Sequence, residues 1–94
     1  MSDRLKGKVA LISGGATGMG GAASILFAAE GAKVAIVDRN LAQAQARVAE
    51  ISATGGQAIA IAADVSDAAQ VTAAVQRATD AFGGFAFEEE RIIF

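Results

Sequence analysis

Three short apolar runs alternate along the chain with three longer segments of helical periodicity. The apolar runs are residues 8–13, 33–38 and 57–62. The first two runs are continuously apolar rather than alternating, as expected of strands that are covered on both faces. This alternation of short and long segments predicts strands and helices in the order βαβαβα around a parallel sheet.

Each longer segment has apolar residues at the spacing of one helix face. The predicted inward faces are Ala22, Ile25, Leu26 and Ala29 in the first helix, Leu41, Ala44, Val48 and Ile51 in the second, and Val71, Ala74, Val75, Ala78 and Phe82 in the third. We predict that Gly31 ends the first helix, and that Asn40 and Ser66 are the N-caps of the second and third. All three helices can then pack on the sheet, whose predicted spatial order is third, second, first strand.

The pattern changes after Gly84. Three consecutive carboxylates, Glu88–Glu90, stand where a fourth buried strand would be expected, and we read them as solvated charge. We therefore predict one domain over residues 1–84 and an irregular tail over 85–94. Within the tail, Arg91–Phe94 is long enough for a short strand that would cover the first strand, whose unpaired edge would otherwise invite self-association.

Composition narrows the class of protein. With 53% hydrophobic and 19% charged residues, the chain is globular rather than disordered. No run approaches the roughly 20 apolar residues that a bilayer crossing needs, and the first residues lack the apolar stretch of a signal peptide. We therefore expect a cytoplasmic protein without a membrane partner. A net charge of −2 also leaves no basic surface for nucleic acid.

Several residue types that carry chemistry are absent. The chain has no cysteine, histidine or tyrosine. This excludes disulfides, thiolate metal sites, cysteine nucleophiles and the commonest general base. We expect no metal site.

The first apolar run leads directly into a glycine-rich turn that opens the first helix. Glycines tolerate positive φ, and a pyrophosphate can approach backbone N–H groups closely where no Cβ intervenes. The helix N-terminus behind the turn adds free N–H donors and partial positive charge. A Walker-type phosphate loop is excluded because no Gly-Lys-Ser/Thr follows. The candidate phosphate-binding residues are Gly14, Thr17, Gly18, Met19 and Gly20.

Two acidic residues follow the second and third runs. Asp38 lies 18 positions after Gly20, near the offset of roughly 20 at which a carboxylate binds an adenosine ribose and repels a 2′-phosphate. This favours NAD over NADP, although the neighbouring Arg39 could pair with a phosphate. Asp64 and Val65 lie at the same sheet edge, where they are candidates for adenine contact, or Asp64 serves only as a local turn former.

With these residues identified, the chain resembles the short-chain dehydrogenase/reductase family from about Leu5 to Gly84. The segments that carry this resemblance are the opening segment Leu5–Ile12, the turn Ser13-Gly14-x3-Gly18-Met19-Gly20, Asp38, and the pair Asp64-Val65. Ser13 and Met19 depart from the usual Thr and Ile of the turn. The resemblance implies a truncated Rossmann-like α/β half that binds a nicotinamide dinucleotide. It also implies that the Asp64 carboxylate accepts from the adenine amino group while the Val65 N–H donates to the ring.

The family's catalytic residues are missing from this chain. An Asn-Asn-Ala-Gly motif should follow Gly84 within about ten residues by that resemblance, and it does not. The family's Tyr-x-x-x-Lys pair is also absent, since there is no tyrosine and the last lysine is Lys33. The resemblance implies hydride transfer between NAD and an alcohol or carbonyl in the parent family, and cofactor binding alone here. The alternatives are a non-catalytic adenosine-nucleotide-binding module, half of an adenosyl-methionine methyltransferase, and a non-functional truncated product.

Overall fold

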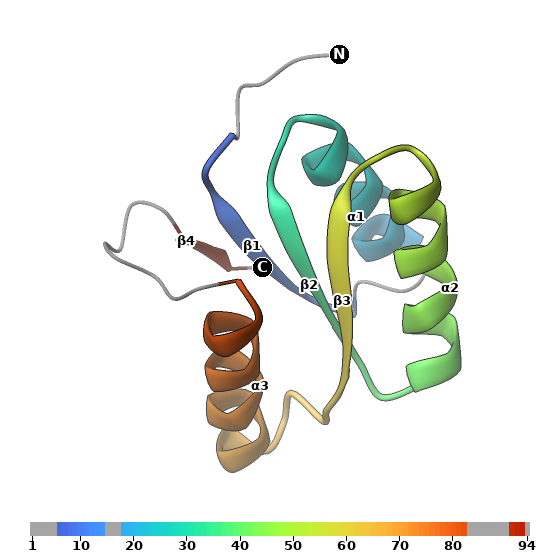
Figure 1. Cartoon of the computed structure of the whole chain (residues 1–94). Helices are drawn as coiled ribbons and strands as arrows, with labels where there is room; N and C mark the ends of the chain where they lie inside the picture. Colours follow the sequence, from blue (N-terminus) through green and yellow to red (C-terminus); the bar gives the residue numbers. More distant parts are fainter. Residues whose placement is uncertain (1–5, 15–17, 83–90, 94) are drawn as a thin grey trace.

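Four strands form a parallel sheet in the computed structural model, which describes residues 6–14, 18–82 and 91–93, the last of these by backbone alone. The strands are β1 (Val9–Ser13), β2 (Lys33–Asp38), β3 (Gln57–Ala62) and β4 (Arg91–Ile93). Their spatial order is β3-β2-β1-β4 (Figure 1). The predicted order of the first three strands is confirmed.

Helices cover both faces of the sheet, which explains why β1 and β2 are apolar without alternation. The helices are α1 (Gly18–Ala29), α2 (Leu41–Ala53) and α3 (Ala68–Ala81). Helices α1 and α2 lie on one face and α3 lies on the other (Figure 1). No helix in the part of the chain that the structure describes is long and apolar enough to cross a membrane.

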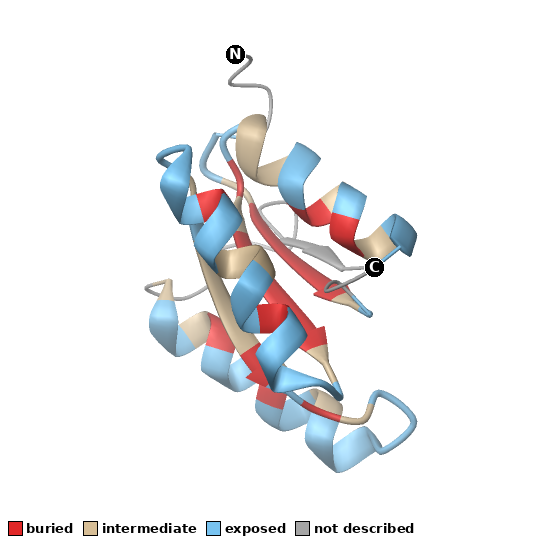
Figure 2. Ribbon diagram, turned by 90° about the vertical axis from the view of Figure 1, so that its right-hand side faces the viewer, coloured by how far each residue is buried: buried red, intermediate tan, exposed pale blue. Residues whose placement is uncertain are grey.

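The core consists of two clusters, one on each face of the sheet. Val34 and Ile36 of β2 point into the cluster beneath α1 and α2, and Ala35 and Val37 point into the cluster beneath α3. The buried residues of the strands form a continuous band between the helices (Figure 2). The predicted inward faces of α2 and α3 are confirmed with two exceptions: Leu41 at the start of α2 is 41% exposed, and Val71 of α3 is only half-buried and is not part of the core cluster.

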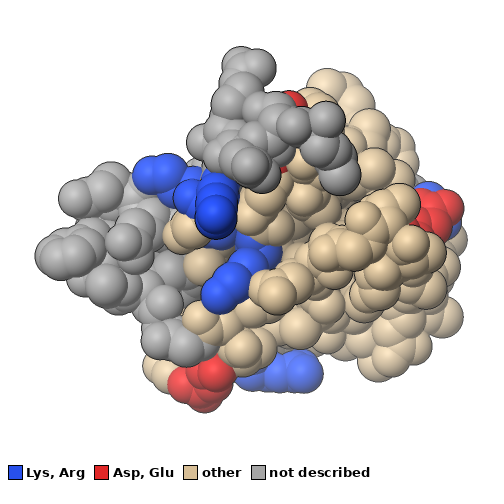
Figure 3. Space-filling model, turned by 45° about the horizontal axis from the view of Figure 1, so that its top comes forward, with Lys and Arg blue, Asp and Glu red and all other residues tan. Residues whose placement is uncertain are grey.

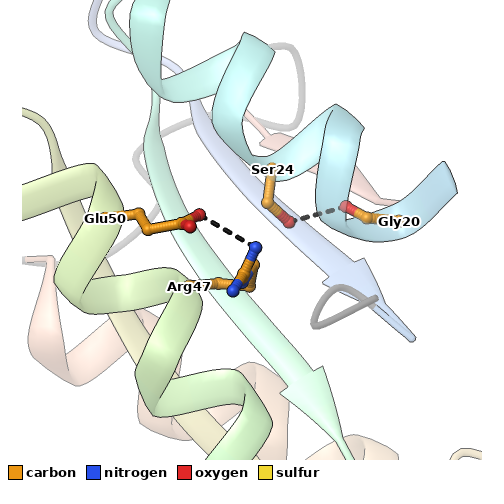
Figure 4. A network of polar contacts seen from close by, with 4 residues as sticks. All are labelled: Gly20, Ser24, Arg47 and Glu50. Atoms are coloured by element: carbon orange, nitrogen blue, oxygen red, sulfur yellow. Dashed lines mark hydrogen bonds and ion pairs between the residues drawn. The ribbon is translucent and has the colours of Figure 1, made fainter. Parts of the chain in front are cut away.

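The predicted inward face of α1 is wrong. Ile25 and Leu26 are 42% and 56% exposed, and the buried residues of α1 are Gly21 and Ser24. The fully buried positions of α1 are therefore small residues, and Phe27 and Ala28 beside them pack against the core cluster. The Ser24 hydroxyl donates to the Gly20 carbonyl at 2.9 Å, one turn earlier in the same helix (Figure 4).

Helix α2 presents an ion pair near this small face of α1. The Arg47 Nη1 atom lies 2.9 Å from Glu50 Oε2, one turn along α2 (Figure 4). The pair is partly exposed, so it contributes little to the free energy of unfolding. The contact between the two helices therefore depends on the small residues of α1 and on the apolar cluster beneath.

The helix caps agree with the sequence in one case and differ in the other. The Asn40 side chain accepts from the Gln43 N–H at 3.1 Å, so it is the N-cap of α2 as predicted. The N-cap of α3 is Asp67, one residue later than predicted. The predicted cap, Ser66, instead donates both its N–H and its hydroxyl to the carboxylate of Asp64. A neighbouring carboxylate thus engages the serine in the preceding turn and leaves the cap to Asp67.

The expectation of an irregular tail is wrong for residues 91–93. They form β4, which pairs with β1 in parallel with Val9 opposite Arg91 and Leu11 opposite Ile93. The short strand expected at Arg91–Phe94 is confirmed for its first three residues. Two β-branched isoleucines favour this extended conformation, and the open edge of β1 supplies the hydrogen-bonding partner. Glu88–Glu90 lie outside the described residues.

Candidate functional site

The loops that follow the strands bring several of the predicted site residues together at one edge of the sheet. In a parallel sheet all the carboxyl ends of the strands meet at the same edge, where ligands bind in open α/β folds. A hollow of about 180 Å³ lies there. It is lined by Gly14, Val37, Asp38, Arg39, Ala63 and Val65. Four of these six residues were predicted from the sequence, and they come from three separate loops.

A second hollow, of about 220 Å³, adjoins the first and shares Arg39 and Ala63 with it. Its remaining lining residues are Ala62, Asp64 and Gln70. Asp64 therefore borders the neighbouring hollow while Val65, the next residue, borders the first. The predicted pair lies across the boundary between the two.

The glycine-rich turn leaves room beside its backbone. Gly14 and Gly18 have φ angles of 64° and 59°, which residues other than glycine rarely adopt. A Cβ atom placed on either residue would meet nothing within 4 Å. The Gly14 N–H donates to the Val37 carbonyl at 2.7 Å, so Gly14 offers space and conformation rather than a free donor.

The start of α1 faces the same edge. Gly18, Met19 and Gly20 are its first three residues, and the first N–H groups of a helix have no partner within the helix. The Met19 side chain is 90% exposed. Thr17 lies outside the described residues. The donors and the open space suit a small anion, since they need no lysine or arginine.

Asp38 is held at the end of β2 by its own turn. Its Oδ1 atom accepts from the Asn40 N–H at 2.9 Å. Its carbonyl accepts from the Ala63 N–H at 3.2 Å, which ties the ends of β2 and β3 together. Within the described residues no donor other than Asn40 contacts the carboxylate, so the Oδ2 atom can accept from a ligand.

Asp64 is held in a similar way after β3. Its Oδ1 atom accepts from the Ser66 hydroxyl at 2.7 Å and from the Ser66 N–H at 2.9 Å. These two hydrogen bonds, the hydroxyl first, lower the pKa of the Asp64 carboxyl; burial opposes them, and the positive charge of Arg39 adds the smallest lowering effect. The group is therefore a carboxylate, and an acceptor only, at neutral pH.

A larger hollow of about 430 Å³ lies at the opposite, amino edge of the sheet. Lys6 and Lys33 are among its lining residues, and basic side chains gather on this side of the molecule (Figure 3). Helices α1 and α2 end there, at Ala29 and Ala53. Helix C-termini carry partial negative charge, which lysines balance and which repels an anionic ligand. The larger size therefore does not make this hollow the better candidate.

Four residues that line the two hollows were not predicted: Val37, Ala62, Ala63 and Gln70. Ala63 lines both hollows, and Gln70 accepts the Asp64 N–H at 2.7 Å through its Oε1 atom. An alanine has no chemical signature that could single it out. The spacing of Asp67 and Gln70 is that of a helix-capping pair and could have drawn attention to the glutamine. Among the described residues no group of three acidic, histidine or cysteine residues could hold a metal ion.

Comparison with known proteins identifies the family of this chain. The family described as short chain dehydrogenase matches residues 8–86. The 2,5-dichloro-2,5-cyclohexadiene-1,4-diol dehydrogenase LinX of Sphingobium indicum is 55% identical over 84 residues, which are 89% of this chain and 34% of that protein. The galactitol 2-dehydrogenase of Agrobacterium fabrum is 47% identical over 81 residues, 86% of this chain and 30% of that protein.

Solved structures of similar proteins share the fold. A hydroxysteroid dehydrogenase from Escherichia coli superposes with a TM-score of 0.83 at 37% identity, over 86% of this chain and 33% of that one. A short chain dehydrogenase from Burkholderia cenocepacia, solved in complex with NADP, superposes with a TM-score of 0.81 at 49% identity, over 87% and 34%. The chain thus spans about a third of the length of these relatives. From the family match over most of its length, the chain belongs to the short chain dehydrogenase family.

Proposed function

We propose that this chain binds a nicotinamide dinucleotide at the carboxyl edge of the sheet, through the adenosine and pyrophosphate of the cofactor. The observation that carries the proposal is the hollow that joins Gly14, Asp38, Arg39 and Val65 from three loops. The start of α1 borders the same edge, and the unit responsible is residues 1–84. Membership of the short chain dehydrogenase family, whose members bind such cofactors, supports this choice.

Each group of residues has one role in this proposal. The start of α1, at Gly18, Met19 and Gly20, receives the pyrophosphate on its free N–H groups. Gly14 keeps the approach open, and Thr17 is included because it directly precedes Gly18 in the sequence.

The adenosine end meets the two acidic loops. Asp38 accepts from the ribose hydroxyls through its Oδ2 atom, because Oδ1 is already engaged by Asn40. Asp64 accepts from the adenine amino group and the Val65 N–H donates to the ring. Adenosyl-methionine is disfavoured as the ligand, because the family match is to dehydrogenases and not to methyltransferases.

We propose NAD rather than NADP as the preferred cofactor. A carboxylate at Asp38 binds both ribose hydroxyls and repels a 2′-phosphate. Two observations favour NADP instead: Arg39 lines the same hollow, and the relative from Burkholderia cenocepacia was solved with NADP. For NADP to be preferred, the attraction between its 2′-phosphate and the guanidinium of Arg39 would have to exceed the repulsion between that phosphate and the Asp38 carboxylate, which lines the same hollow.

Titration of the chain with NADH and NADPH, followed by calorimetry, tests this proposal. We expect NADH to bind more tightly by about tenfold or more, the value of one hydrogen-bonded charged group. Asp38→Ala should remove the preference, whereas Asp80→Ala, which removes an exposed aspartate of α3, should leave it unchanged. Tighter binding of NADPH by the unaltered chain, abolished by Arg39→Ala, would reverse the choice of cofactor. Binding of neither cofactor would contradict the proposal.

The chain alone should not catalyse hydride transfer. When bound, the nicotinamide would supply the hydride chemistry, but the proton relay of the parent family needs a tyrosine and a lysine that this sequence does not place after residue 84. Binding without turnover would make the chain an adenosine-nucleotide-binding module. Oxidation of NADH above background with any ketone or aldehyde would contradict this part of the proposal.

A further inference from the structure

Gln70 joins the turn after β3 to the start of α3 through both ends of its side-chain amide. Its Oε1 atom accepts from the Asp64 N–H at 2.7 Å. Its Nε2 atom donates to Asp67 Oδ2 at 3.3 Å. Gln70 is the third residue of α3, so its position is fixed by the helix, and it lines the same hollow as Asp64.

Helix capping alone does not explain this arrangement. An acidic N-cap followed three residues later by glutamine predicts a capping box, in which the glutamine would accept from the N–H of the N-cap residue. Here the Asp67 N–H donates to the Asp64 carbonyl at 3.0 Å instead. The Gln70 oxygen reaches three residues further back, to Asp64. Asp67 caps the helix with its own side chain, which accepts from the Ala69 N–H at 2.9 Å.

Asp64 is consequently held at three of its polar groups. Its carbonyl accepts from Asp67, its Oδ1 atom accepts from Ser66, and its N–H donates to Gln70. The first two contacts lie within the turn and would move with it. The contact with Gln70 ties the turn to the body of α3, which packs on the sheet through Ala74 and Ala78. It therefore anchors the backbone from which the Asp64 carboxylate projects.

We propose that Gln70 is a positioning residue that fixes Asp64 for recognition of the adenine amino group. This inference rests on the proposed function, because it concerns the same dinucleotide site. Adenine presents an amino donor to the carboxylate, whereas hypoxanthine presents a carbonyl oxygen at the same position. A carboxylate held in a fixed position discriminates between these two bases by affinity. A carboxylate that moves with a loose turn discriminates between them poorly.

The test compares NADH with its hypoxanthine analogue, deamino-NADH, by calorimetric titration of the full chain. We expect the unaltered chain to prefer NADH by about tenfold or more. Gln70→Leu removes both hydrogen bonds and should reduce the preference to about threefold or less. Gln70→Glu keeps an oxygen that can accept the Asp64 N–H but sets a second carboxylate beside Asp67, so it should restore only part of the preference. The ratio of the two affinities is the readout, since a merely structural role would weaken both ligands equally.

Gln76→Leu is the matched control. Gln76 is another exposed glutamine of α3 and donates through Nε2 to Asp80 Oδ1 at 2.9 Å, so the same substitution removes a similar contact away from the site. It should leave the preference unchanged. A full preference in Gln70→Leu, or an equal loss in Gln76→Leu, would overturn the inference.

Amide hydrogen exchange tests the same contact without a ligand. The Asp64 amide should exchange at least about tenfold faster in Gln70→Leu than in the unaltered chain or in Gln76→Leu. An unchanged rate would show that Gln70 does not hold the turn. Faster exchange together with no binding of NADH by the unaltered chain would instead mean that the proposed function fails while the contact exists. The two failures are therefore distinguishable.

Discussion

Single carboxylates at the candidate site are oriented by the protein before any ligand is present. Asp38 and Asp64 each use the Oδ1 atom to hold a local turn and leave the Oδ2 atom to accept from a ligand. This division lowers the entropic cost of binding, because the side chain does not have to be ordered by the ligand. The same turn also affects the ionisation of Asp64, because the two hydrogen bonds that Ser66 donates favour the ionised form of the carboxyl group.

We predict that Ser66→Ala raises the pKa of Asp64 toward its ordinary value of 3.8. A lowered pKa in the folded chain stabilises the fold above the pKa of the unfolded state, and this contribution disappears as the pH falls through the folded pKa. The variant should therefore lose less stability on acidification than the unaltered chain. An NMR titration of the Asp64 carboxyl carbon measures the shift, with Ser52→Ala on α2 as the control. An unchanged pKa in Ser66→Ala would contradict the assigned cause.

At this scale, the sequence predicted residues with a chemical signature and missed those without one. Gly14, Asp38, Arg39 and Val65 have recognisable spacing or charge, and they meet in one hollow. Ala63 has neither, and its place depends on the hydrogen bond between its N–H and the Asp38 carbonyl, which only the paired strands create.

The helices show how local competition between side chains decides an element's limits and its buried face. Helix α3 begins after Asp67 because the hydroxyl of Ser66 is engaged by Asp64. Helix α1 buries Gly21 and Ser24 although its neighbours are larger and more apolar. Periodicity could not predict that face, because α1 carries apolar residues on all sides and the hydrophobic pattern does not choose among them.

The cap assignment gives a direct comparison of two adjacent residues. Asp67→Ala should lower the free energy of unfolding by about 1 kcal/mol, the usual effect of losing an N-cap. Ser66→Ala should lower it by less, about 0.5 kcal/mol or below at neutral pH, because the hydrogen bond that it loses to Asp64 is exposed to solvent. Urea denaturation of the two variants measures both values. A larger loss of unfolding free energy in Ser66→Ala than in Asp67→Ala would indicate that Ser66, the residue predicted from the sequence, is the N-cap of α3.

The whole molecule is one sheet with an apolar cluster on each face and a short strand at one edge. Strand order and the placement of helices followed from the alternation of apolar runs, because parallel strands need helical crossovers of one hand. The fourth strand was harder to predict. It has only three residues, and its pairing with β1 depends on the rest of the sheet already being formed.

Removal of the tail should expose that sheet edge. We predict that a chain ending at residue 84 aggregates, whereas the chain of 94 residues is monomeric under the same conditions, because β1 then loses the strand that pairs with Val9, Ala10 and Leu11. Light scattering at matched concentrations provides the measurement. A monodisperse monomer of the shorter chain would show that β4 is not needed to protect the edge.

The central claim is that the carboxyl edge of the sheet binds the dinucleotide, and amide chemical-shift mapping by NMR with NADH tests it most directly. We predict that the shifted amides belong to the loops that contain Gly14, Asp38 and Asp64. The amides around the larger hollow at the opposite edge, near Lys33 and Gly56, should not shift. Shifts confined to that opposite edge, or no shift at saturating NADH, would contradict the account.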